Sequence, residues 1–255
     1  MGLKPRKRII VTCKSCFLIL LLSVFALGPL AAQEEENPGA TDLLRLYFDN
    51  VYGDDERLIT GHFYYGPAKG SIKGHPYYFD DSWKNGIIET DDAVFEGLRV
   101  KYDICINRLI INYTTTDNAS YQIGLNSGKI NRVKMAGNEF IPLPGSSDST
   151  GIPFARLISD GPVKYLVTRE KSLEISNSTG SPDYEYKEYV RQYLWYDGNL
   201  KRFRSKNTLY RAFPEVKGRL KRFARQNYLY LIRNSINDRK MLIDYCNHLL
   251  SGKDE

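Results

Sequence analysis

The pattern of apolar and polar positions changes twice along the 255-residue chain. A long apolar run follows a basic start near the N-terminus, the middle of the chain alternates between apolar and polar residues, and the spacing becomes helical after Phe203. Alternation with period two indicates strands, and recurrence every three to four residues indicates helices. Strands that precede helices in this way predict an α+β fold, in which an antiparallel β-meander carries a C-terminal helical segment.

The clearest strand runs through residues 98–104. Its apolar face consists of Leu98, Val100, Tyr102 and Ile104, and its polar face of Arg99, Lys101 and Asp103. One buried face and one solvated face are typical of an antiparallel strand that covers a core. A second apolar run, residues 109–113, follows Asn107-Arg108 and is expected to return alongside the first.

Pairs of turn-forming residues recur between the later strands. They are Ser127-Gly128, Asp160-Gly161 and Asp197-Gly198. Asp-Gly pairs supply the positive backbone angles of a tight hairpin, so we expect each pair to join two antiparallel strands. Asn85-Gly86 is a candidate for an earlier turn, and the Ser- and Gly-rich stretch 142–153 is a candidate loop. The resulting meander is either an open sheet or a partly closed barrel.

Helical spacing dominates the C-terminal part of the chain. Asn207 or Thr208 is expected to cap a short helix that ends at Pro214, and a second, basic helix follows it. The apolar positions of the second helix are Val216, Leu220 and Phe223. A last helix is predicted from Asn237-Asp238 to Gly252. Its apolar stripe is Leu242, Tyr245, Cys246 and Leu249.

The first 32 residues have the features of an export signal. The basic start contains Lys4, Arg6, Lys7, Arg8 and Lys14. The apolar stretch 17–27 follows, and Gly28-Pro29 and Ala31-Ala32 supply the helix break and the small residues that suit signal peptidase. We expect cleavage after residue 32 and an exported protein that is periplasmic, envelope-associated or extracellular. An uncleaved membrane anchor over residues 9–32 is the alternative, because that length can span a bilayer.

Removal of this signal changes the charge balance. It takes away five positive charges and leaves 31 Lys and Arg against 30 Asp and Glu. Residues 33–198 carry 17 basic and 25 acidic side chains, whereas residues 199–255 carry 14 and 5. We therefore divide the exported chain into a flexible acidic leader (33–41), an antiparallel β-rich domain (42–203) and a basic helical segment packed on it (204–255).

The basic helical segment and the residues just before it hold candidate ligands for an anion. Ten Lys and Arg side chains occur in residues 199–225, with Glu215 as the one acidic residue. We select as candidate anion-binding residues Lys201, Arg202, Arg204, Lys217, Lys221 and Arg222. Outside the cytoplasm the anions at hand are anionic lipid, lipopolysaccharide and acidic glycan, and nucleic acid is not an expected partner. The alternatives are a solvated basic face and a contact with another envelope protein.

No residue pattern in the sequence identifies a reaction. A Gly-x-Ser-x-Gly pentapeptide is absent, and the three histidines, His62, His75 and His248, lack metal-ligand spacing. Adjacent acids occur at 54–56, 80–81 and 91–92, where turns also explain them. The sequence thus assigns no catalytic, cofactor-binding or metal-binding residue and no cofactor. It favours an exported cell-envelope binding or structural module, and the alternative is an envelope hydrolase that acts on glycans through unidentified carboxylates.

Tyrosine is unusually frequent, with 19 residues in the chain. The aromatic residues that fall in clusters are Tyr64, Tyr65, Tyr77, Tyr78, Tyr184, Tyr186, Tyr189, Tyr193, Trp195 and Tyr196. Exposed rings of this kind suit contact with sugars or peptides, and buried rings form cross-strand pairs. We expect these rings to be buried.

Two cysteines, Cys105 and Cys246, stay in the chain after cleavage of the signal. Exported proteins meet conditions in which disulfides persist, so the two residues form either a bridge between strand and helix or two separate free thiols. We expect free thiols, with Cys246 as a small apolar residue of the core.

Three stretches of the chain carry a resemblance to a known family. They are Gly74-His75-Pro76-Tyr77-Tyr78, residues 98–104, and Tyr193 to Gly198 continuing into residues 201–213. In these stretches the chain resembles a family of exported β-rich proteins of Gram-negative bacteria, over about two thirds of the exported chain. The family has no assigned activity or catalytic residues, so the resemblance implies export and a shared architecture.

Overall fold

The computed structural model describes residues 62–67, 72–114, 119–146, 151–176, 183–229 and 235–252. All of them belong to the compact unit Leu43–Glu255. The predicted export signal, the acidic leader and the acids at 54–56 lie outside the described residues. Among the described helices, none is both long and apolar enough to cross a membrane.

The described strands form one large sheet. They are β1 (His62–Phe63), β2 (Ile72–Lys73), β3 (Lys84–Thr90), β4 (Val94–Asp103), β5 (Arg108–Thr114), β6 (Ser120–Gly124), β7 (Ile130–Met135), β8 (Asn138–Pro142), β9 (Phe154–Ser159), β10 (Lys164–Ser176), β11 (Asp183–Tyr196) and β12 (Asn199–Arg202). Their order in the sheet is β1-β6-β5-β4-β3-β7-β8-β9-β10-β11-β12, and β2 pairs in parallel with β11. Since β1 and β12 stand at opposite ends of this order, the sheet is open rather than closed into a barrel. The predicted α+β class is confirmed.

Two of the predicted hairpins are confirmed. Asp197 and Gly198 both have positive φ, +49° and +71°, and Tyr196 pairs directly with Asn199 across a two-residue turn. Asp160-Gly161 lies in the connection between β9 and β10, which pair antiparallel. β4 and β5 also pair antiparallel, as the two apolar runs predict.

Two other turn predictions are wrong. Ser127-Gly128 starts a short 3-10 helix, η1 (Ser127–Lys129), and the flanking strands do not pair, because β6 lies beside β1 and β5 while β7 lies beside β3 and β8. Asn85-Gly86 lies inside β3 and makes no turn. A Cβ on Gly86 would stand 2.7 Å from Cγ2 of Val100, so glycine serves there to let β3 approach β4 closely.

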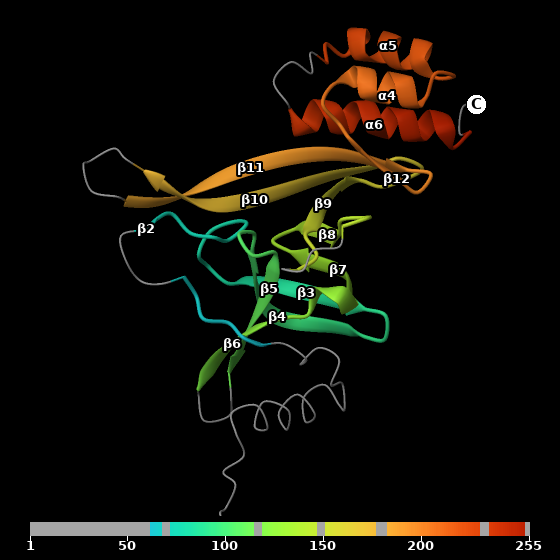
Figure 1. Cartoon of the computed structure of the whole chain (residues 1–255). Helices are drawn as coiled ribbons and strands as arrows, with labels where there is room; N and C mark the ends of the chain where they lie inside the picture. The colour runs from blue at the N-terminus through green and yellow to red at the C-terminus, as the bar shows by residue number, and fades with distance from the viewer. Residues whose placement is uncertain are drawn as a thin grey trace, which may run out of the picture. The chain divides into compact units, whose positions relative to one another are not determined.

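Buried apolar side chains form two clusters. The first lies among β3 to β9 and includes Val100, Tyr102 and Phe140, and the rings of the last two meet edge to face. The second joins β10 and β11 to the helices and includes Tyr165, Leu194 and Leu242. In Figure 1 the helices lie on one side of the long β10–β11 ribbon and strands β3 to β9 on the other. The ribbon therefore contributes side chains to the cluster under the helices.

The predicted polar face of β4 is solvated at Arg99 but not at Lys101 and Asp103. Lys101 and Asp103 are only 8% and 3% exposed. The segment before β3 covers them: the Lys101 ammonium lies 4.4 Å from the ring centre of Tyr77, and the Asp103 carboxylate accepts a hydrogen bond from the hydroxyl of Tyr64. A long-range contact overrides the alternating pattern here, because polar groups can be buried once they are paired.

The helical segment contains α4 (Lys206–Ala212), α5 (Lys217–Gln226) and α6 (Ile236–Leu250). Helix α4 begins earlier than predicted, with Ser205 rather than Asn207 or Thr208 at its N-cap. The predicted apolar positions of α5 and α6 are confirmed: Val216, Leu220, Leu242, Cys246 and Leu249 are buried. The partly buried rings of Phe223 and Tyr245 stack with their centres 4.1 Å apart and join α5 to α6.

Both described cysteines are free, as expected. Cys246 lies in the core under the helices, and burial raises the pKa of its thiol to about 12. Cys105 lies in the turn between β4 and β5, where burial and the neighbouring Asp103 also raise the thiol pKa. Neither environment favours a reactive thiolate.

Candidate functional site

Two hollows lie in the surface of the basic C-terminal half, among the residues that the structure describes. The first, which we call the arginine hollow, has a volume of about 310 Å³. It is lined by Val190, Arg191, Gln192, Arg202, Phe203, Arg204 and Arg239. Four of these seven residues carry a guanidinium group and none is acidic. This lining therefore concentrates positive charge in one concave place.

Three parts of the chain build the arginine hollow. β11 supplies residues 190–192, the end of β12 and the connection to α4 supply residues 202–204, and the first turns of α6 supply Arg239. The amide of Phe203 donates a hydrogen bond of 2.7 Å to the carbonyl oxygen of Gln192, which continues the β11–β12 pairing beyond the last strand residue. The Phe203 ring packs edge to face on Tyr165 in the core. The backbone beside Arg202 and Arg204 is therefore held against β11.

Arg239 forms the buried part of the arginine hollow, with an exposed fraction of 1%. Its Nη1 donates to Oε1 of Gln192 at 2.7 Å and to the carbonyl oxygen of Phe203 at 2.6 Å. Its Nη2 donates to the carbonyl oxygen of Arg204 at 3.1 Å. These three acceptors are uncharged oxygen atoms. Burial lowers the pKa of the guanidinium, but arginine remains protonated in proteins.

The outer part of the arginine hollow is formed by exposed side chains. Arg202 and Arg204 are exposed, and neither forms an ion pair with the residues that the structure describes. Arg191 pairs with Glu170 of the neighbouring strand β10. Two guanidinium groups therefore face solvent beside a third that the fold holds in place. Such groups match the geometry of carboxylate and phosphate oxygens.

A second hollow, which we call the helical hollow, lies between α4, α5 and the residues after α5. Its volume is about 470 Å³. It is lined by Lys206, Asn207, Tyr210, Lys221, Ala224, Arg225, Tyr228 and Leu229. These lining residues include three cations and no acid. The ring of Tyr228 is 73% exposed, and its backbone has a positive φ of 52°.

The amphipathic pattern of α5 explains why cations gather beside the helical hollow. Leu220 and Ala224 are buried against the core, and this turns the basic residues outward. The exposed basic side chains of α5 are Lys217, Arg219, Lys221, Arg222 and Arg225. The apolar stripe docks the helix, so the basic face remains available at the surface.

The structure separates the six candidate anion-binding residues. Arg202 and Arg204 line the arginine hollow, and Lys221 lines the helical hollow. Lys217 and Arg222 are exposed on α5 and are in the lining of neither hollow. The ammonium of Lys201 lies 5.6 Å from the ring centre of Tyr196. The candidates thus belong to a broad basic surface with two concave places.

Two arginines of the arginine hollow are not among the residues selected from the sequence. Arg191 comes from a strand, and Arg239 comes from the last helix, far from the basic run at 199–225. The sequence does contain an indication for Arg239. This residue precedes Leu242 by three positions and Ile243 by four, which places it on the buried face of α6. A charged residue on an apolar helix face requires polar partners, which is a sign of a specific contact.

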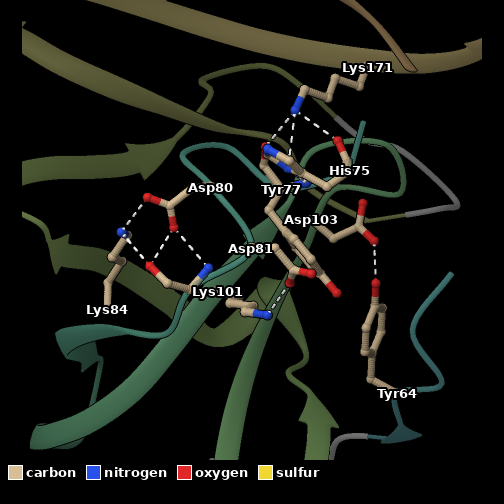
Figure 2. A network of polar contacts seen from close by, with 10 residues as sticks. Tyr64, His75, Tyr77, Asp80, Asp81, Lys84, Lys101, Asp103 and Lys171 are labelled. Carbon is tan, nitrogen blue, oxygen red and sulfur yellow. Dashed lines mark hydrogen bonds and ion pairs between the residues drawn. The ribbon is translucent and has the colours of Figure 1, made fainter. Parts of the chain in front are cut away.

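A separate polar cluster joins the segment before β3 to strands β4 and β10, as Figure 2 shows. The Tyr64 hydroxyl donates to Oδ2 of Asp103 at 2.6 Å, and the amides of Cys105 and Ile106 donate to Oδ1 of the same carboxylate. Burial raises the pKa of Asp103. Lys171 on β10 donates to the carbonyl oxygens of His75 and Tyr77, both at 2.8 Å.

The other acids of this polar cluster are also engaged. Asp81 pairs with Lys101 at 2.5 Å, and Asp80 pairs with Lys84 at 2.8 Å and accepts a hydrogen bond from the amide of Ser82. Each of these contacts ties the segment before β3 to itself or to its neighbouring strands. The polar cluster is therefore a structural connection, since its carboxylates accept hydrogen bonds from the protein's own donors.

The three histidines differ in exposure and in surroundings. His62 on β1 and His248 on α6 are exposed, while His75 is half-buried beside Lys171. Burial, and after it the charge of Lys171, lowers the pKa of His75. Within the described part of the chain, no group of three or more His, Cys, Asp and Glu side chains is arranged to hold a metal ion.

The prediction that the clustered aromatic rings are buried holds for Tyr77 and Tyr78. It is wrong for three others, because Tyr65 is 86% exposed and Tyr184 and Tyr189 on β11 are also exposed. The remaining rings are half-buried: Tyr64, Tyr186, Tyr193, Trp195 and Tyr196. The reason is that β11 lies near one end of the sheet order, so its outer residues have few neighbours to cover them.

No protein-family model matches this chain, and neither a curated protein nor a solved structure matches it significantly.

Proposed function

We propose that this protein is an exported anion-binding module of the cell envelope, which docks on phosphate-bearing lipid or lipopolysaccharide through its basic C-terminal half. The observation that carries the proposal is that four arginines line the arginine hollow, two lysines and an arginine line the helical hollow, and neither lining contains an acidic residue. Volumes of about 310 and 470 Å³ fall in the lower range of ligand pockets.

The placement of the basic residues supports contact with a surface rather than with the protein's own acids. The exposed face of α5 carries the cations, while its apolar face is used for packing on the core. Tyr228 adds an exposed amphipathic ring beside Lys221 and Arg225 in the helical hollow. Aromatic rings of this kind are favoured where apolar and polar environments meet, as at a membrane interface.

The hydrolase alternative has less support. Glycoside hydrolysis uses two carboxyl groups placed on either side of the scissile bond. In the polar cluster, Asp80, Asp81 and Asp103 are each engaged by a lysine, a hydroxyl group or backbone amides. The exposed tyrosines of β11 suit a glycan contact, but they supply no acid.

The test is binding of the purified protein to vesicles of phosphatidylglycerol mixed with phosphatidylcholine, measured by sedimentation. Binding should weaken as salt rises from 0.1 M to 1 M, because the screening length falls from about 10 Å to about 3 Å. Replacement of Lys206, Lys221 and Arg225 by glutamine should reduce the partition coefficient roughly 100-fold, at about 1 kcal/mol for each basic residue near an anionic surface.

A matched control changes the same charge elsewhere. Arg99, Lys129 and Lys134 are exposed on the strand side of the protein, and their replacement by glutamine should leave vesicle binding unchanged. Equal losses in both triple variants would mean that net charge alone governs binding, and absence of binding at low salt would reject the proposal. Equal binding to a sulfated glycan and to vesicles would reassign the partner to acidic glycan.

A further inference from the structure

The arginine hollow differs from the rest of the basic surface because its backbone and its deepest charge are fixed by the fold. Arg239 joins three separate elements: it extends from α6 and donates to Gln192 on β11 and to the carbonyl oxygens of Phe203 and Arg204 after β12. Its guanidinium lies 4.7 Å from the ring centre of Phe203. The hydrogen bond to the carbonyl oxygen of Arg204 holds the backbone from which that side chain extends.

The lining of the arginine hollow brings four positively charged side chains together. Arg202 and Arg204 lie in the same lining as Arg191 and Arg239. Arg191 pairs with Glu170, whereas Arg202 and Arg204 form no ion pair with the residues that the structure describes. Like charges repel, and the repulsion grows where water is excluded. A bound anion with several acceptor oxygens relieves this repulsion, because one ligand can accept hydrogen bonds from more than one guanidinium.

We infer that the arginine hollow is a binding site for one phosphate monoester group, with Arg202 and Arg204 as the residues that contact it and Arg239 as the positioning residue. This inference rests on the proposed function, because it assigns the chemical class of ligand to one of its two hollows. A phosphate dianion offers three terminal oxygens and about two negative charges at neutral pH. Two exposed guanidinium groups beside a buried one match this charge and shape better than they match a planar carboxylate with a single charge.

The pH dependence of binding separates a phosphate monoester from other anions. The second pKa of a phosphate monoester is about 6, so the ligand gains its second charge between about pH 5 and 7.5. The lining contains four arginines, one glutamine, one valine and one phenylalanine, and it holds no histidine, aspartate or glutamate. The acid next to this lining is Glu170, which pairs with Arg191.

The experiment titrates the purified protein with inorganic phosphate and with glycerol 1-phosphate, by isothermal calorimetry at about pH 5.5 and about pH 7.5, on either side of the phosphate pKa. We expect saturable binding that is stronger at the higher pH. The double variant Arg202→Gln with Arg204→Gln should bind roughly 10- to 100-fold more weakly, as expected for the loss of charge-assisted hydrogen bonds. The matched control, Arg99→Gln with Lys134→Gln, removes two exposed cations of β4 and β7 that line neither hollow and should bind like the wild type.

Two further arms identify the source and the geometry of the ligand. Vesicles of phosphatidic acid, which presents a monoester, should compete with soluble glycerol 1-phosphate if the phosphate is carried by lipid, and phosphatidylglycerol, a diester, should compete less. Sulfate keeps the tetrahedral shape but does not titrate near the phosphate pKa of about 6. Sulfate binding that equals phosphate binding at the higher pH would overturn the assignment of a phosphate monoester.

The outcome also distinguishes this inference from the proposed function. Wild-type binding of phosphate that the Arg202 and Arg204 double variant retains in full overturns the site. Failure of phosphate to bind while vesicle binding stays salt-sensitive and depends on Lys206, Lys221 and Arg225 overturns the phosphate site and leaves the proposed function standing. Circular dichroism and the Tm of each variant show that the fold is kept, which is expected because Arg202 and Arg204 are exposed.

Discussion

The ammonium of Lys171 lies 3.4 Å from Nδ1 of His75, although both side chains are bases. Nδ1 of His75 accepts a hydrogen bond from the amide of Tyr77 at 3.2 Å, so this nitrogen carries no proton in the structure. The Lys171 ammonium is held by the carbonyl oxygens of His75 and Tyr77. The segment before β3 is therefore joined to β10 by contacts that require a neutral imidazole.

Protonation of His75 should loosen this connection. Burial and the Lys171 charge lower the pKa of His75 below the ordinary 6.5, so the unfolded chain takes up the proton first as pH falls. The contribution of neutral His75 to stability is complete above about pH 6.5 and is lost as pH falls through the lower, folded-state pKa. We expect the Tm of the wild type to fall between about pH 7 and pH 5 by more than that of His75→Asn.

Comparison between variants is needed because Asp103 titrates with the opposite sign. Burial raises the pKa of this carboxyl above 3.8, so its effect on stability is most favourable at low pH and weakens as pH rises through the folded-state value. Asp80, Asp81 and Lys101 also act on His75 through their charges. Replacement of the exposed His248 by glutamine is the control, and a pH dependence equal in all three proteins would contradict the role of His75.

Arg239 should be one of the most sensitive positions for stability. Its guanidinium makes three described hydrogen bonds between α6 and the strand layer, and hydrogen bonds to charged groups are worth about 1.5–3 kcal/mol each. Lysine keeps the charge but loses the fork that reaches several acceptors at once. We expect Arg239→Lys to lower the free energy of unfolding by about 3 kcal/mol, measured by urea denaturation.

The neighbouring Lys240 provides the comparison for this variant. It is exposed and pairs with Asp244 one turn further along α6. Such pairs contribute about 0.3–0.5 kcal/mol, so Lys240→Gln should change stability only slightly. A similar small effect of Arg239→Lys would show that the buried hydrogen bonds contribute little.

Two glycines should respond to alanine with opposite signs. A Cβ on Gly86 would lie 2.7 Å from Cγ2 and 3.2 Å from Cβ of Val100, so Gly86→Ala overpacks the contact between β3 and β4 and should destabilise by about 1–3 kcal/mol. Gly218 lies in α5, where a Cβ would have no atom within 4 Å. Gly218→Ala should stabilise by about 0.5–1 kcal/mol through helix propensity. Thermal unfolding of both variants measures the contrast, and a stabilising Gly86→Ala would refute the packing argument.

Features set by neighbouring residues could be predicted from the sequence, and features set by distant contacts could not. The Asp197-Gly198 turn needs positive φ at both positions, and the stripe of α5 repeats along one helix, so each depends on a few adjacent residues. The pairing of β7 with β3 depends on strands far apart in the chain. Asn85-Gly86 has the composition of a turn, yet the approach of Val100 decides its role.

In the candidate site, too, the features set by neighbouring residues could be predicted and those set by distant contacts could not. The basic run at 199–225 was visible because its charges are close together in the chain, and it contains Arg202, Arg204 and Lys221 of the two hollows. The concave shape of each hollow depends on residues brought in from elsewhere. Arg191 and Arg239 reach the arginine hollow from β11 and α6, and only the tertiary fold places them beside Arg202. Sequence therefore predicts the charge of the surface and not its hollows.

The connection between α6 and the β9–β10 loop gives the last prediction. Asn247 is buried on α6, where its Oδ1 accepts from the amide of Val163 at 2.8 Å and its Nδ2 donates to the carbonyl oxygen of Val163 at 2.9 Å. Gly161 packs so closely on this side-chain amide that a Cβ would lie 2.8 Å from it. The side chain thus pairs with both backbone groups of one buried residue, as a neighbouring strand would.

Replacement of Asn247 by alanine should leave the buried amide and carbonyl of Val163 without these partners. Each buried polar group that loses its hydrogen bond costs about 1–3 kcal/mol, so we expect the free energy of unfolding to fall by about 2–4 kcal/mol in urea denaturation. Asn237→Ala, at an exposed position of the same helix, should have a small effect. Because the amide and carbonyl are needed together, Asn247→Asp should recover only part of the loss: its carboxylate can accept from the Val163 amide but cannot donate to the carbonyl when ionised. An aspartate variant as stable as the wild type would show that the bond to the Val163 carbonyl does not hold α6 on the strand layer.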